Sequence, residues 1–194
     1  MMHLLCDPFP DTVTADGETF RVLTDFREWM RFADMLADPE LTAEEKAYLC
    51  RMWFDPEPDT ITESQLLALI GFYRADALHP DPPDQDEEDE PEEEPVHRPY
   101  FDWKIDAAYL IGDFRHYYGI DLLAIEFLHW FKFRALFEAL PDDSTCMKRI
   151  AYRSADLNKI RDKHERARIA RIQKQIALPF ELDDAAIGEI FSTQ

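Results

Sequence analysis

Histidine and cysteine are the residue types that most often carry catalysis or hold metal ions, and this chain has six and three of them. Cys6, Cys50 and Cys146 lie far apart and form no CxxC pair, so neither a disulfide framework nor a zinc site is expected. No histidine has a Cys or a second His at metal-ligand spacing, and no phosphate-loop, nucleophile-elbow or HExxH motif is present. We therefore predict no catalytic residue, no cofactor and no metal, and expect that the protein is not an enzyme.

Two histidines come nearest to a chemical site. His116 follows Asp113 by three residues on a predicted helix, but polar pairs at this spacing are common on solvated helix faces. His129 lies in an apolar run and could act as a buried proton switch. The commoner outcome for such a histidine is that neighbouring oxygen atoms satisfy its ring nitrogens. Neither residue by itself predicts catalysis.

The charge of the chain is strongly acidic and unevenly distributed. There are 41 Asp and Glu residues against 21 Lys and Arg, a net charge of −20, which argues against general affinity for nucleic acid or anionic lipid. Residues 79–99 combine proline with a dense acidic run and predict a flexible linker. The alternative is an acidic segment that binds a basic partner or mimics nucleic acid. By contrast, residues 148–174 hold ten basic and three acidic residues.

Local patterns in the first half predict a hairpin and three helices. Residues 11–23 are typical of a β-hairpin, with Asp16-Gly17 in the turn. Each predicted helix has a threonine as N-cap, and the second and third have Glu or Gln three residues later, as in a capping box. The predicted N-caps are Thr24, Thr42 and Thr62.

The second half is also predicted to be helical. A helix is expected over 102–118 and ends at Gly119. Asp121 is the expected N-cap of a helix over 122–140, which is apolar on most sides and should be the core helix of this half, packed against 102–118. Charges interrupt the apolar run, so it is not a membrane span. The basic region predicts one long helix or two, with an exposed basic face as a candidate partner contact: Lys148, Arg149, Arg161, Arg168 and Arg171.

These patterns predict a mainly α protein, a helical bundle with a small N-terminal β-hairpin and a long basic C-terminal helix. The expected organisation is a hairpin plus helical unit over 1–78, an acidic Pro-rich flexible linker over 79–99, and a C-terminal helical unit over 100–194. The two units could form separate domains or one. The N-terminus lacks the basic and apolar regions of a signal peptide, which favours a cytoplasmic protein.

The stretch DAAYLIGDFRHYYGIDL, followed by LHWFKFRALFEAL and DDSTCMKRIAYR, resembles the bacteriophage gene-product-fifteen family of siphophages and prophages. The TDFR segment at 24–27 is a weaker match. No catalytic residues come with this family, and we expect the matching positions to be mostly structural. The sharpest matches are Tyr118, Gly119, Ile120, Asp121, Leu122, Leu128, His129, Trp130, Lys132, Phe133, Ile150 and Arg153.

Members of this family are encoded close to the tape-measure gene. The resemblance therefore implies a non-enzymatic tail assembly protein, a chaperone that binds the tape-measure protein while the tail tube polymerises in the infected or lysogenic host. The alternative is a structural virion component, such as a connector or tail-completion protein. The expected partners are the tape-measure protein, other tail proteins or a second copy of the chain, with nucleic acid unlikely as a partner on charge grounds and no membrane involved.

Overall fold

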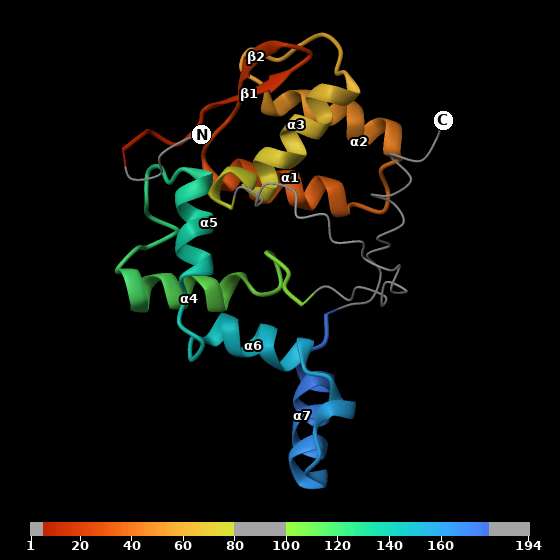
Figure 1. The fold of residues 1–194 in the computed structure, drawn as a ribbon, viewed down its shortest axis with the longest axis vertical. Helices are drawn as coiled ribbons and strands as arrows, with labels where there is room; N and C mark the ends of the chain where they lie inside the picture. The colour runs from red at the N-terminus through yellow and green to blue at the C-terminus, as the bar shows by residue number, and fades with distance from the viewer. Residues whose placement is uncertain (1–5, 80–99, 179–194) are drawn as a thin grey trace, which may run out of the picture. The chain divides into compact units, whose positions relative to one another are not determined.

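The computed structural model describes residues 6–79 and 100–178, which are mainly α-helical, as predicted (Figure 1). The described residues contain seven α-helices and one two-stranded sheet. The chain divides into two compact units. The first unit holds the described residues 6–79 and 127–138, and the second holds 100–126 and 139–178. Residues 80–99, which hold all but the first residue of the predicted acidic linker, lie outside the described residues, and so do residues 179–194.

The predicted hairpin is confirmed. Strands β1 (Thr12–Ala15) and β2 (Glu18–Arg21) pair antiparallel. Asp16 and Gly17 have φ angles of 53° and 79°, the left-handed conformation that a two-residue hairpin turn needs. The turn is tied to the start of α3 (Glu63–Arg74), because the hydroxyl of Thr62 donates to the carboxylate of Asp16 at 2.9 Å.

Three helices follow the hairpin: α1 (Phe26–Ala37), α2 (Ala43–Cys50) and α3, with short 3-10 turns η1 (Arg51–Trp53) and η2 (Asp76–Leu78). The predicted capping boxes at Thr42 and Thr62 are both present. The prediction of Thr24 as the N-cap of α1 was wrong. Asp25 caps this helix, and its carboxylate accepts from the backbone N–H of Arg27 at 3.0 Å.

The predicted helix over 122–140 is much shorter than expected and packs elsewhere. Helix α5 covers only Trp130–Glu138, and Asp121 is not its N-cap. Residues 122–124 form a turn instead, which is closed by the bond that Ile125 N–H donates to Asp121 O at 2.9 Å. Residues 128–130 pair with the segment that precedes α1: Phe26 N–H donates to Leu128 O at 2.9 Å, and Trp130 N–H donates to Thr24 O at 2.7 Å. Helix α5 therefore packs against α1 in the first unit and is not the core helix of the C-terminal half.

The core of the first unit is aromatic. Trp29, Phe32, Trp130 and Phe133 are fully buried, and Trp130 stacks on Tyr73 of α3 with ring centroids 5.7 Å apart. Each buried indole N–H also finds a backbone carbonyl, as large amphipathic rings in a core require. The donor–acceptor pairs are Trp29 with Leu23 at 2.8 Å, Trp53 with Glu28 at 2.9 Å, and Trp130 with Tyr73 at 2.9 Å.

The second unit begins with an irregular segment, and helix α4 covers Ala107–Tyr118. The helix starts later than predicted, because Asp102 accepts from the backbone N–H groups of Lys104 and Ile105 and so forms a turn there. Its end is as predicted. Gly119 has a φ angle of 68°, and the N–H of Ile120 reaches back to Phe114 O at 3.2 Å.

The basic region forms two helices and not one long helix. Helix α6 covers Thr145–Ser154, η3 covers Leu157–Lys159, and α7 covers Lys163–Ile176. The break has a local cause. Asp156 accepts from the N–H of Asn158 and begins η3, and Asp162 accepts from the N–H of Glu165 and begins α7. Among the helices of the two described stretches, none is both long and apolar enough to cross a membrane.

Candidate functional site

Two of the motif segments lie side by side in the first unit. Asp25 and His129 form an isolated antiparallel bridge, although 104 positions separate them along the printed sequence. Besides the two backbone bonds that flank this bridge, the N–H of Leu128 donates to the Asp25 carboxylate at 3.4 Å. The TDFR and LHW segments therefore form a single structural joint that holds α5 against α1.

His129 is held by both of its ring nitrogens. Nδ1 accepts from the N–H of Phe131 at 3.1 Å, so the proton lies on Nε2, which is 3.1 Å from the carbonyl oxygen of Pro10. Burial lowers the pKa of His129, and the bond to Pro10 and the charge of Asp11 only partly oppose this. The ring stacks on Phe9 at 5.2 Å. His129 is thus a satisfied, neutral core histidine.

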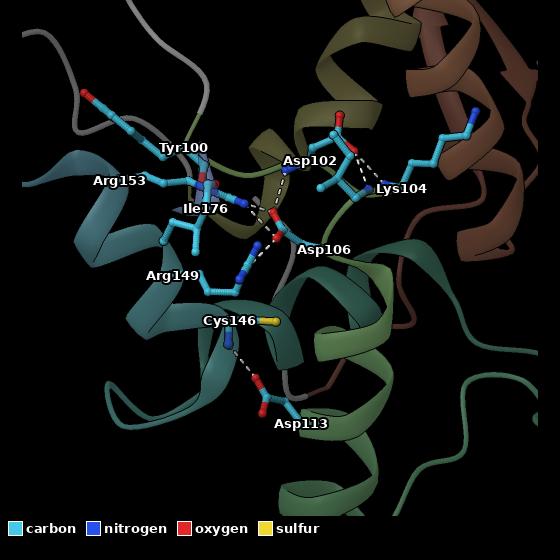
Figure 2. Close-up of polar contacts among 10 residues, drawn as sticks. Tyr100, Asp102, Lys104, Asp106, Asp113, Cys146, Arg149, Arg153 and Ile176 are labelled. Atoms are coloured by element: carbon cyan, nitrogen blue, oxygen red, sulfur yellow. Dashed lines mark hydrogen bonds and ion pairs between the residues drawn. The ribbon is translucent and has the colours of Figure 1, made fainter. Parts of the chain in front are cut away.

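The second unit is organised around a buried carboxylate, Asp106, which Figure 2 shows bonded to Arg149 and Arg153. Asp106 precedes α4 and is fully buried. Arg153 Nη1 lies 2.5 Å from one carboxylate oxygen, and Arg149 Nε lies 2.9 Å from the other. The two arginines are four residues apart on α6, so they project from the same face of that helix. The ion cluster therefore fastens α6 to the start of α4.

Arg153 extends this cluster to two further segments. Its Nη1 donates to the carbonyl of Tyr100 at 3.0 Å, and its Nε donates to the carbonyl of Ile176, at the end of α7, at 2.8 Å. Burial alone would raise the pKa of Asp106, but the bonds from Arg153, Asp102 N–H and Arg149 outweigh burial and lower it. Asp106 is therefore charged at neutral pH, and the two arginines are its counter-charges.

Asp113 has a related role on the next turns of α4. Its carboxylate accepts from the backbone N–H groups of Thr145 at 3.1 Å and Cys146 at 2.7 Å, at the N-terminus of α6. A carboxylate at this position also favours the helix dipole. His116 is exposed and packs edge-on against Tyr117. The expected solvated face shared by Asp113 and His116 is wrong for Asp113, which is buried and caps a helix.

The remaining motif residues are also mostly structural. Tyr118 packs against Phe114, and Gly119 ends α4. Asp121 accepts from the N–H of Leu123 at 3.1 Å and lies 3.8 Å from Arg115. Leu122 and Leu128 are buried, and Phe133 stacks on Phe26 at 5.0 Å. Lys132 is exposed.

The five candidate partner contacts divide into three groups. Arg149 is not available to a partner, because it pairs with buried Asp106 and lies over the ring of Tyr109. Arg168 is exposed and forms a bidentate pair with Glu165 on the same helix. Among the described residues, Lys148, Arg161 and Arg171 are exposed and form no ion pair. Only this third group presents unneutralised charge.

Sequence reasoning missed Asp106, the residue on which the second unit depends. Of its two arginine partners, Arg149 was predicted to contact another protein and Arg153 to be a mostly structural motif residue. The carboxylate lies 43 and 47 residues before them, so no local spacing connects the three. The detectable signal was an Asp just before the first turn of α4.

The two buried thiol groups, those of Cys50 and Cys146, are poor nucleophiles in this fold. Burial raises the pKa of Cys50 to about 12, and burial together with the nearby Asp113 raises the pKa of Cys146 as well. In residues 6–79 and 100–178, no three His, Cys, Asp or Glu side chains gather as metal ligands. The clusters described above hold helices together and leave no reactive atom exposed within them.

These features define a mainly α protein whose buried polar clusters are structural. The model of the family described as Bacteriophage Gp15 protein matches residues 5–178, and the chain belongs to this family. Membership makes it a phage protein with a structural or assembly-related role. No curated protein and no solved structure matches the chain.

Proposed function

We propose that this protein is a tail assembly chaperone that binds the tape-measure protein in the cytoplasm of an infected or lysogenic host and catalyses no reaction. Membership of the phage family supports the assembly role. The observation that carries the chaperone role is the exposure of a large apolar side chain on each unit, Leu123 on the second and Phe127 on the first. Leu123 is 78% exposed and Phe127 is 56% exposed.

Such exposure has a free-energy consequence. Burying a Leu or Phe side chain contributes about 1.5–3 kcal/mol, so these two residues offer binding free energy that the fold itself does not use. A tape-measure protein presents long helices with apolar stripes before the tube encloses it. Contact between such a stripe and exposed apolar side chains on an acidic carrier would keep the client dispersed.

Co-expression with the tape-measure protein of the same phage tests the proposal. The expected result is a soluble complex, and Leu123→Ser and Phe127→Ser, made separately, should each reduce the amount of complex recovered. Ala124→Ser is the matched control, because Ala124 is exposed beside Leu123 but has little apolar surface. If the client stays insoluble and no complex forms with the unaltered protein, the chaperone proposal is wrong.

A structural virion component is the second candidate. Helix α7 favours it, because this basic helix has no buried residue and could therefore be covered in an assembled particle. Mass spectrometry of purified particles separates the two roles. A stoichiometric amount in mature virions would replace the chaperone proposal with this one, whereas a chaperone should be absent from them.

A further inference from the structure

The segment over 155–176, which we call the basic arm, is built differently from the rest of the described chain. It contains η3 and α7, and neither has a buried residue, whereas helices α1 to α6 each have at least one. The arm is attached at one end. Arg153 donates to Ile176 O, and the side-chain amide of Gln173 donates to Tyr152 O at 2.9 Å and Ala155 O at 2.8 Å.

The apolar side chains of the arm are only half covered. Ile169, Ile172 and Ile176 recur at helical spacing along α7, and all three are partly exposed. A helix of this length gains most of its stability from burying such a stripe, and not from its intrinsic propensity. The arm therefore has an apolar face suited to a partner surface.

The charge of the arm specifies what kind of surface would fit. The arm holds seven Lys and Arg residues against three Asp and Glu. Glu165 is already used by Arg168. Within the described part of the chain, Arg161, Arg166, Arg171 and Lys174 are exposed and form no ion pair. A complementary surface should be acidic and carry exposed apolar side chains.

The chain itself has such a surface around α2. Residues 38–59 include seven Asp and Glu against two basic residues. Of these two, Lys46 is buried, and Arg51 pairs with Glu57 at 3.1 Å and lies over one face of the Tyr48 ring at 4.0 Å. Tyr48 and Met52 are 55% and 54% exposed, and Glu44 lies one turn before Tyr48 on the same face. We call this the α2 surface.

We propose that the basic arm of one copy docks on the α2 surface of a second copy. The chemistry is complementary on both counts, since basic side chains meet acidic ones and the isoleucine stripe covers Tyr48 and Met52. Two chains of net charge −20 repel at long range, so the arm supplies the local positive charge that allows contact at short range. Because the two surfaces differ, the contact is head-to-tail and continues into a ring or a filament. This inference goes beyond the chaperone role and does not require the tape-measure protein.

Sedimentation velocity over a wide range of concentrations tests the contact. The full chain should assemble as its concentration rises, and Arg166→Glu with Arg171→Glu should weaken self-association by about tenfold or more, because like charges then face each other. Glu40→Lys with Glu44→Lys should have the same effect from the other side. Lys104→Glu with Lys132→Glu is the matched control, since both lysines are exposed outside the arm and should leave assembly unchanged.

The decisive experiment mixes the two weakened variants. In the mixture, the acidic arm of the first variant meets the basic α2 surface of the second, and the unaltered arm of the second meets the unaltered surface of the first. The mixture should therefore associate more tightly than either variant alone. Far-UV circular dichroism of each variant verifies that α7 remains helical. The proposal is overturned if the unaltered chain is monomeric at every concentration, or if folded variants fail to complement each other in the mixture.

Discussion

In the first unit, Trp130 holds α5 against its neighbours with an aromatic face and an indole N–H, whereas in the second unit Asp106 holds α6 against α4 with two arginines. Both residues join segments that are distant in the sequence. The aromatic joint depends on buried area and close packing, which lose stability in proportion to the atoms removed. The ionic joint is stable only while all three charged side chains are present, because removal of one leaves the others buried without a counter-charge.

The largest expected effect is on the aromatic joint. Trp130→Ala should destabilise the first unit by about 3–5 kcal/mol, since it removes a fully buried ring and leaves a cavity. Hydrogen exchange resolved by segment should show the loss in 26–37 and 63–74. Lys132→Ala, on the exposed face of the same helix, is the control and should change stability very little. Equal loss of protection in α6 would mean that the units do not unfold separately.

Asp106→Asn should have the next largest effect, about 3 kcal/mol on the second unit, because Arg153 and Arg149 keep their charges without a counter-charge. Urea denaturation followed by hydrogen exchange in α4 and α6 measures this loss. Arg153→Met should cost less in the Asp106→Asn background than alone, since the pair acts as a unit. If the two losses simply add, the ionic joint does not work as described.

A matched pair of glycine substitutions should show that the units differ in their cores and not in their turns. Gly17 lies in the hairpin of the first unit and Gly119 ends α4 in the second, with φ angles of 79° and 68°. Gly17→Ala and Gly119→Ala should each cost about 1 kcal/mol, because an added Cβ strains the left-handed backbone. Thermal denaturation compares the stability of the two variants. A much larger loss of stability in one of them would show that its substitution also disturbs the packing of the core.

The smallest expected effect is a difference in response to acid. The pKa of His129 is lowered from 6.5, so its contribution to the first unit is complete above pH 6.5 and is lost as pH falls below that value. The pKa of Asp106 is lowered from 3.8, so its contribution to the second unit persists to a lower pH and is lost as pH falls through that lowered pKa. Exchange protection measured against pH should fall first around His129. His129→Gln should remove that early step, and an unchanged profile would contradict it.

The features that sequence reasoning predicted correctly are local ones. Asp16-Gly17 sets its turn through two adjacent residues, and the capping boxes at Thr42 and Thr62 each span three residues. The errors arose where distant segments decide the conformation. The apolar run over 122–140 has helical composition, but residues 128–130 pair with the segment before α1, and no pattern within the run shows this.

The same limit explains the errors at the candidate site. From the sequence, Arg153 belongs to the mostly structural family motif, while Arg149 lies on a basic helix face that should contact a partner. The fold instead brings Asp106 against it, because the irregular 100–106 segment places this carboxylate at the start of α4. A charged side chain is buried only where a counter-charge meets it, and here that counter-charge is distant in the sequence. The sequence of α6 alone therefore does not show which of its arginines are buried.

The shared guanidinium of Arg153 has one further consequence. Its donors are divided between the buried Asp106 and the last carbonyl of α7, that of Ile176. A movement of α7 therefore displaces Arg153 and disturbs its contacts with Asp106. Conversely, a partner that holds α7 in place should stabilise these contacts. Segment 100–106 lies outside both docking surfaces. Its amide protons should nevertheless exchange more slowly with solvent once chains associate.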